Sequence, residues 1–262
     1  FSLDHIGPLS RTVSDSAHIM QAIAGHDLKD STTSTLPVPN YLESLGRSIK
    51  GLRIAVPNNH FQDAVDPVLQ PFLDDSIDVF RACGAEIVHV TLPKSLELAA
   101  SLGAILLSVE GATHHSKWIR ERFGEYNAAQ FKRLLPGLYY PATRYLEALN
   151  LRTKVVSEFV NAVFDVADLF HAPSVPIPVP TVADSDLAND PNFNNFVGRF
   201  TGYNRPFNYM GLPALCLPAG FDVQGLPLGF QLVGRPFDEA MLIRVGHAYE
   251  RETTWTQMAP SL

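Results

Sequence analysis

Apolar residues along the first third of the chain recur at helical spacing in some segments and at strand spacing in others. Four apolar positions, followed by Gly25, predict a helix over residues 16–24 that is capped by Ser14 or Asp15. A polar loop rich in Ser, Thr and Pro comes next. The pattern then predicts a strand over residues 53–57, a helix from Pro67 to about Cys83 and a strand over residues 86–92.

The succession of strand, helix and strand over residues 53–92 indicates two parallel strands joined by a helical crossover, which is typical of α/β sheets. Further along, helical spacing predicts a long helix over residues 96–122, broken near Gly103 or Gly111. The other expected elements are a helix over 142–166, a strand over 168–173, an irregular loop over 174–195, a helix over 196–209, strands over 213–218 and 228–233, and a final helix capped by Asp238 that ends near Tyr249.

No stretch of biased composition divides the chain, and no internal repeat occurs. We therefore expect one body of the α/β class, with a mixed, largely parallel β-sheet flanked by helices.

Composition narrows the possible partners. The 262 residues are 46% hydrophobic and 18% charged, and the most apolar windows, 96–109 and 214–221, are too short or too interrupted to predict a membrane span. A net charge of −7 without a basic block argues against nucleic acid. The two cysteines, Cys83 and Cys216, predict neither a disulfide framework nor a metal pair, so we expect a cytoplasmic protein.

The residues alone provide no complete active site. No nucleophile elbow and no glycine-rich phosphate loop is present. Glu110 and His114 share one helical face, but no third ligand suggests itself, so we expect no metal. Glu250 is interpreted as part of a solvated helix end, and Cys216 as a small hydrophobic residue in a strand. The aromatic residues at helical spacing are interpreted as core: Phe196, Phe200, Tyr203 and Phe207.

Four segments resemble the amidase signature family of amide hydrolases. Residues 1–15 read FSLDHIGPLSRTVSD and resemble "SLDxxGPxxRTVxD", and residues 25–31 resemble "GxDxxDS". Residues 206–214 read PFNYMGLPA, and residues 225–239 read GLPLGFQLVGRPFDE; they resemble "PFNxxGLPA" and "GLPxGxQLxGRPFDE". The segments follow the family order from one end of the chain to the other.

The resemblance implies a Ser–cis-Ser–Lys mechanism without a cofactor, in which an acyl-enzyme forms and is hydrolysed. In the family, these residues and the oxyanion site lie in a Gly/Ser-rich segment that precedes the segment matched by residues 1–15. We therefore expect residues 1–262 to be the C-terminal portion of a single domain, inactive alone, with no catalytic residue. The start at Phe1, without an initiator Met, suggests a fragment of a longer protein.

Two positions are compared with the glutamine-binding amidotransferase A subunits of the family. Arg133, four residues before Gly137, resembles an arginine that binds the substrate carboxylate there. Thr201, ten residues before Gly211, stands where those subunits carry an acidic residue for the substrate ammonium. We therefore expect Arg133 and Thr201 to bind substrate, and the loss of the acid argues against glutamine. Phe200, Tyr203, Phe207 and Tyr209 permit an apolar acyl group.

The main interpretation is thus an amidase that acts on a small-molecule amide. One alternative is an amidotransferase A subunit, which requires a second subunit as its partner. Another is a non-catalytic binding protein, if the native chain starts at Phe1. The sequence leaves a homodimer open.

Overall fold

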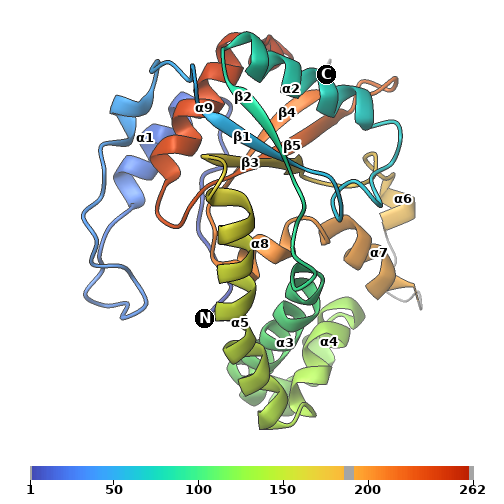
Figure 1. Cartoon of the computed structure of the whole chain (residues 1–262). Coiled ribbons are helices and arrows are strands. Elements are labelled where there is room, and N and C mark those ends of the chain that lie inside the picture. The colour runs from blue at the N-terminus through green and yellow to red at the C-terminus, as the bar shows by residue number, and fades with distance from the viewer. Residues whose placement is uncertain (1, 186–191, 260–262) are drawn as a thin grey trace.

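The computed structural model describes residues 2–185 and 192–259, and a mixed sheet with helices on both faces lies at its centre (Figure 1). The neighbouring strands are, in spatial order, β2 (Glu86–Val90), β1 (Arg53–Pro57), β3 (Leu169–Pro173), β5 (Pro227–Val233) and β4 (Ala214–Phe221). Strand β1 pairs parallel with β2 and β3, whereas β5 pairs antiparallel with β3 and β4. The predicted α/β class with a mixed, helix-flanked sheet is confirmed. Within the described residues, two strand pairings are parallel and two are antiparallel, so the expectation that the sheet is largely parallel is wrong.

The predicted strand–helix–strand unit is also confirmed. Helix α2 (Gln70–Ala82) joins β1 to β2, whose parallel register places Arg53 opposite Glu86 and Pro57 opposite Val90. The helix begins three residues after the predicted Pro67, and its first-turn proline is Pro71. A proline is tolerated there because the first-turn N–H groups have no partner within the helix.

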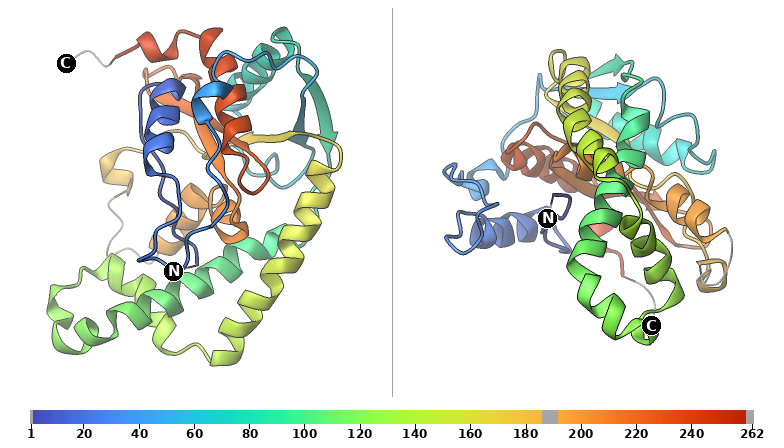
Figure 2. Two further views of the ribbon diagram at one scale, coloured as in Figure 1. Left: turned by 90° about the vertical axis from the view of Figure 1, so that its left-hand side faces the viewer. Right: turned by 90° about the horizontal axis from the view of Figure 1, so that it is seen from below.

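Alternating residues of the strands feed two cores. Ile54 and Leu169 face one core, and the next residues in the chain, Ala55 and Phe170, face the other. The first core also takes side chains from α1 (Val13–Ile23), α2 and α9 (Glu239–Arg251). The second takes them from α3 (Leu96–Glu121), α5 (Ala142–Phe164) and α8 (Arg205–Met210). Helices α3 and α5, with α4 (Ala128–Leu134), extend away from the sheet as an arm (Figure 2).

Helix α3 is continuous, so the predicted break near Gly103 or Gly111 is wrong. Both glycines are sites of close packing instead. A Cβ on Gly103 would lie 3.5 Å from the Tyr209 side chain, and one on Gly111 would lie 2.7 Å from Leu134. The glycines therefore let α8 and α4 approach α3 closely, and the helix hydrogen bonds of α3 continue through both positions.

By length and composition, α3 is also long and apolar enough to cross a membrane, with a mean hydropathy of 1.4 over its most apolar window. The prediction that no window is long enough is therefore wrong for this helix. Its apolar face packs into the second core through Leu96, Leu102 and Leu106. Packing within the protein thus accounts for the apolar character of this face.

The helix predicted over residues 196–209 is two helices, α7 (Phe193–Thr201) and α8. The break at residues 202–204 comes directly before Arg205-Pro206. Proline disfavours helical geometry in the residue before it and lacks an N–H, so a new helix starts here with Pro206 in its first turn. The loop predicted over 174–195 contains the short helix α6 (Val182–Ser185) and the first residues of α7, and residues 186–191 lie outside the described residues.

Helix caps differ from the predictions at two places. Helix α1 is capped by Thr12, whose hydroxyl accepts from the Asp15 N–H at 3.0 Å, and not by Ser14 or Asp15. Asp238 precedes α9 but makes no side-chain capping hydrogen bond.

Glu250, predicted to be part of a solvated helix end, makes a tertiary contact instead. Its Oε2 accepts a hydrogen bond from the N–H of Val13 at 2.8 Å and so joins the last turn of α9 to the start of α1.

Candidate functional site

The backbone around Arg133 is held in place by α3. The Ser108 hydroxyl donates to the Arg133 carbonyl oxygen at 3.0 Å. Gly137, in the 3₁₀ turn that follows α4 (Leu135–Leu138), packs so closely on α3 that a Cβ would stand 1.9 Å from the Ser108 carbonyl oxygen. The absence of a side chain at Gly137 therefore allows the close contact with α3 that positions α4 and, with it, the backbone of Arg133.

The Arg133 guanidinium is exposed and lies near a second arginine. Burial, and then the positive charge of Arg133, lower the pKa of the half-buried Arg205 on α8. Within the described part of the chain, neither guanidinium has a hydrogen bond or an ion pair with a carboxylate. Two unpaired positive charges near one another favour an anion and disfavour an ammonium group.

Thr201 is the last residue of α7 and lies four residues before Arg205. Its side chain is half-buried, and the hydroxyl donates back to the Val197 carbonyl oxygen at 2.6 Å. The hydroxyl proton is therefore already used, and only the oxygen lone pairs remain for a ligand. The structure thus brings Arg133 towards Arg205, on the helix that follows Thr201, but neither predicted site residue is tested as a substrate contact.

Of the four aromatic residues predicted to be core, Tyr203 and Phe207 are buried, whereas Phe196 and Phe200 are not. Phe207 is buried and stacks on Phe61 with ring centroids 5.7 Å apart, and Tyr203 meets the same ring edge-on at 4.8 Å. Tyr209 is buried, and its hydroxyl donates to the Ala148 carbonyl oxygen at 2.6 Å. Phe196 and Phe200 stack on each other with ring centroids 6.1 Å apart, and 36% of Phe200 remains exposed, so the core prediction is wrong for these two. Of the aromatic residues predicted to permit an apolar acyl group, Phe200 has the most open surface.

Glu110, considered above as half of a metal-binding face, has a different role. Its carboxylate accepts hydrogen bonds from Ser2 and from the Tyr145 hydroxyl. Its neighbour His114 packs edge-on against Trp118. Among the described residues, no group of three His, Cys, Asp or Glu side chains is placed to hold a metal ion.

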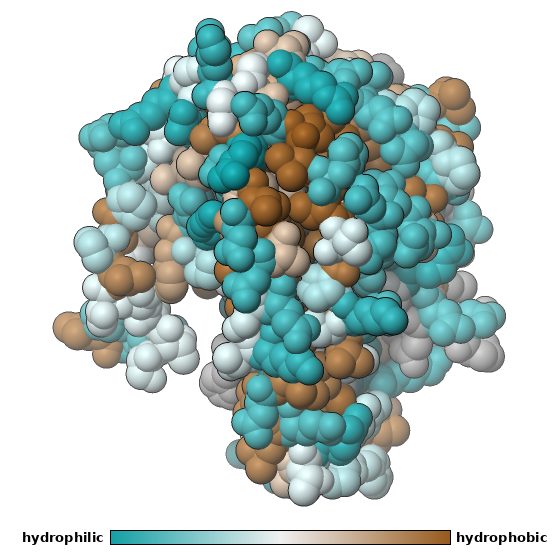
Figure 3. Space-filling model, in the orientation of Figure 1, coloured by the Kyte–Doolittle hydropathy of each residue, from teal (hydrophilic) through white to brown (hydrophobic). Residues whose placement is uncertain are grey.

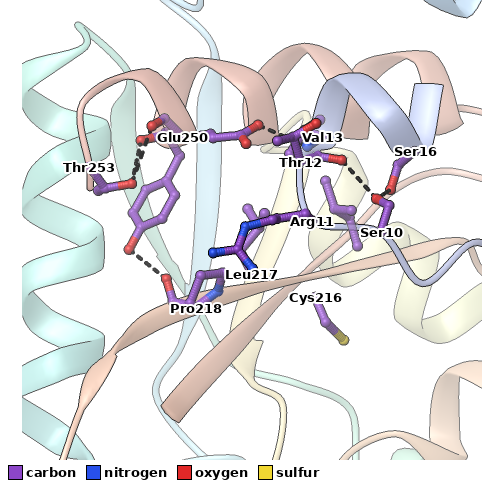
Figure 4. Close-up of a pocket in the computed structure, with 12 residues that line it drawn as sticks. Ser10, Arg11, Thr12, Val13, Ser16, Cys216, Leu217, Pro218, Glu250 and Thr253 are labelled. Carbon is purple, nitrogen blue, oxygen red and sulfur yellow. Dashed lines mark hydrogen bonds between the residues drawn. The ribbon is translucent and has the colours of Figure 1, made fainter. Parts of the chain in front are cut away.

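A small hollow of about 70 Å³ lies between the start of α1 and β4 (Figure 4). Ser10, Arg11 and Cys216 line it, and the Ser10 hydroxyl is hydrogen-bonded to the Thr12 carbonyl oxygen and to Ser16. Cys216 is exposed, so the prediction that it packs as a small hydrophobic residue is wrong. No histidine lines this hollow, and the arrangement provides no nucleophile–base pair.

A larger hollow of about 390 Å³ lies between α2 and strands β1 to β3. In Figure 3, apolar side chains are visible below α2 with a hydrophilic rim around them. The buried His171 lines this hollow, and its Nε2 lies 2.9 Å from the Ser76 hydroxyl. The Ser76 hydroxyl donates to the Leu73 carbonyl oxygen at 2.7 Å, so the imidazole Nε2–H donates to Ser76. Burial lowers the pKa of His171 to about 3, which makes it a poor base for activating a serine.

Comparisons with known proteins give matches that extend over most or all of the chain. The family model described as "Amidase" matches residues 1–243. An amidase from Pseudomonas putida is 37% identical over 263 residues, which cover 100% of this chain and 56% of that protein. The A subunit of the glutamyl-tRNA(Gln) amidotransferase of Geobacter metallireducens is 33% identical and is covered to 57%, with 98% of this chain aligned.

A solved structure of a bacterial aryl acylamidase of the amidase signature family superposes with a TM-score of 0.80 at 23% identity. It matches 96% of this chain and 53% of its own length, and at this identity it shows a common fold. The chain therefore spans about half the length of the relatives that it matches.

Proposed function

The chain belongs to the amidase signature family, and from that membership we propose that the protein of which it forms part hydrolyses the C–N bond of a small carboxamide. The observation that carries the proposal is the similarity to the Pseudomonas amidase, which extends over the whole chain but only 56% of that enzyme. We place the catalytic serines and lysine in a segment upstream of Phe1. Residues 1–262 are then the C-terminal portion of one domain and are inactive alone.

The proposed reaction has two steps. The nucleophilic serine oxygen attacks the amide carbonyl carbon, and its proton passes through the second serine and the lysine to the leaving nitrogen. The C–N bond breaks, ammonia or an amine leaves, and an acyl-serine ester remains. Water then attacks the ester, which regenerates the serine and releases a carboxylic acid. Backbone N–H groups stabilise the oxyanion in both steps, and no cofactor takes part.

The exposed edge of the sheet supports the proposal that this chain is part of a larger protein. Within the described residues, β4 is an outer strand, and its residues Ala214 and Cys216 are exposed. Ile6 and Leu9 are exposed to 91% and 101%. Unpaired edges and apolar groups of this kind attract further strands, so packing of the remaining part of the protein here would cover both.

We assign one wall of the substrate pocket to α4, α7 and α8. The unpaired Arg133 and Arg205 disfavour a substrate ammonium, and Thr201 offers no carboxylate to receive one. Both features favour a carboxamide without an α-ammonium over glutamine. The amidotransferase A subunit remains the second candidate because several relatives carry that name, and it would need partner subunits.

We also propose a reducing cytoplasm as the site of action. Cys83 and Cys216 are both free thiols, and neither forms a disulfide in the structure. Disulfides are common in oxidising compartments, where two free thiols are less expected.

The proposed function and the role of Thr201 are tested together by measuring kcat/KM of the full-length protein. The two substrates are anilides that differ only in an α-ammonium group. Wild type is expected to prefer the uncharged anilide. Thr201→Asp is expected to move the ratio of kcat/KM towards the charged anilide by about 10- to 100-fold, the worth of one charge-assisted hydrogen bond.

Thr201→Asn is the matched control, because asparagine has the size of aspartate but no charge. It should leave the ratio of kcat/KM for the two anilides unchanged. If wild type hydrolyses neither anilide nor any other carboxamide offered, the proposed function fails. If it hydrolyses them and Thr201→Asp leaves the ratio unmoved, only the placement of Thr201 in the pocket fails.

A further inference from the structure

Every backbone and side-chain polar atom of Ser2 is engaged by a side chain from the arm. Its N–H donates to Glu110 Oε2 at 3.0 Å, and its hydroxyl donates to Glu110 Oε1 at 2.7 Å. Arg152 on α5 donates to the Ser2 carbonyl oxygen at 2.9 Å. Asn208 on α8 donates to the next carbonyl oxygen, that of Leu3, at 3.2 Å. Helices α3, α5 and α8 therefore converge on two consecutive residues.

The segment that follows is not held in this way. From Asp4 to Arg11, the described structure contains no backbone–backbone hydrogen bond, and Ile6 and Leu9 are almost fully exposed. The attachment at Ser2 is therefore not part of a strand or helix that continues. It is a local anchor built from side chains of residues more than a hundred positions away along the chain.

The anchor uses both hydrogen-bond donors of Ser2. The Glu110 carboxylate accepts hydrogen bonds from both the N–H and the hydroxyl of Ser2. An alanine at position 2 would keep the N–H but would remove the hydroxyl that donates to Oε1. Burial acts to raise the pKa of Glu110, and the hydrogen bonds from the Ser2 hydroxyl and N–H act to lower it. A carboxylate forms stronger hydrogen bonds with these donors than a neutral acceptor does.

Neighbouring contacts hold the anchor itself in place. The Tyr145 hydroxyl donates to Glu110 Oε1 at 3.1 Å. The Arg152 guanidinium lies over the Tyr209 ring, 5.8 Å from the ring centroid. A Cβ on Gly211 would lie 3.3 Å from Nη2 of Arg152. Because Tyr209 belongs to α8 and Arg152 to α5, the anchor fixes Ser2 relative to both helices at once.

The same arm carries α4, which is part of the proposed pocket wall. Ser108, two residues before Glu110 on α3, binds the backbone of Arg133, and α8 begins with Arg205. We propose that Glu110 is a positioning residue, which holds Ser2 so that the catalytic segment upstream of it stays in register with the wall carrying Arg133 and Arg205. The inference rests on the proposed function, which places that segment before Phe1.

The test uses the full-length enzyme and a carboxamide that wild type hydrolyses. Glu110→Ala is expected to lower kcat by about 10- to 100-fold, since a misplacement of about 1 Å can cost that much, while KM changes little. Glu110→Gln keeps an acceptor oxygen and should restore part of kcat. Glu121→Ala, an exposed glutamate at the end of the same helix, is the matched control and should leave both constants unchanged.

Ser2→Ala supplies a second, milder variant, which serves also if Glu110→Ala does not fold. It should lower kcat by a smaller factor, and it should cause no further loss when added to Glu110→Ala, because the two residues act through one interaction. Circular dichroism and thermal unfolding establish that each variant is folded at the assay temperature.

The inference is overturned if folded Glu110→Ala and Ser2→Ala keep the wild-type kcat, or if their effects are confined to KM or to stability. That outcome leaves the proposed function intact, because wild type would still hydrolyse the amide. Absence of any amide hydrolysis by wild type would instead overturn the proposed function first.

Discussion

Replacing Gly137 with alanine is expected to lower the free energy of unfolding by about 2–4 kcal/mol. The added Cβ would stand 1.9 Å from the Ser108 carbonyl oxygen and 2.8 Å from the Val109 nitrogen. Both atoms are backbone of a continuous helix, so neither can move aside without disturbing α3. The 3₁₀ turn after α4 must move instead, and the Ser108 hydrogen bond to Arg133 should weaken with it. Denaturant unfolding measures the change.

Gly124→Ala is the control, because a Cβ at Gly124 meets no atom within 4 Å. Its effect should stay within about 0.5 kcal/mol. Equal stabilities of the two alanine variants would mean that the turn does not pack on α3 as described, and the positioning of Arg133 would lose its structural basis.

Acid is expected to destabilise the fold through His171. Its pKa is about 3 in the folded state because burial disfavours the charged imidazole, against an ordinary value of 6.5. Between these values the unfolded chain binds more protons than the folded one, so stability falls as the pH falls. The loss from this residue should be about 2 kcal/mol between pH 7 and pH 5, and about 4–5 kcal/mol by pH 3.

His171→Asn removes this titration and should flatten the dependence of unfolding free energy on pH by up to one proton over that window. His89→Gln, at an exposed position on β2, is the control and should leave the slope close to that of wild type. If wild type and His171→Asn show the same slope between pH 7 and pH 5, His171 is not buried in its neutral form.

Local pattern was sufficient where neighbours in sequence decide the structure. The β1–α2–β2 unit follows from apolar residues at strand spacing, then at helical spacing, then at strand spacing again. The pattern failed at Gly103 and Gly111, because a glycine that ends a helix and a glycine that admits a neighbouring helix look alike in sequence. It also missed the proline-dependent break before α8, since Phe207 and Tyr209 continue the aromatic spacing of α7.

The hydrogen bonds between residues far apart in the chain could not be predicted from local sequence patterns. Ser2 and Glu110 are 108 residues apart, Val13 and Glu250 are 237 apart, and Ser76 and His171 are 95 apart. None of these pairs has a spacing signal, because the fold brings them together. Resemblance to a family supplied the motif order and the function class. The roles of Arg133 and Thr201 as substrate contacts stay predictions.

The location of the catalytic serine decides whether this chain is the pocket-forming portion of an amidase. Full-length protein is labelled with a fluorophosphonate, digested, and mapped by mass spectrometry to the modified serine. We expect the label on a serine upstream of Phe1, with loss of amide hydrolysis in proportion to labelling. A label on a serine within residues 1–262, such as Ser2, Ser10 or Ser76, that disappears together with activity when that serine is changed to alanine would contradict the account.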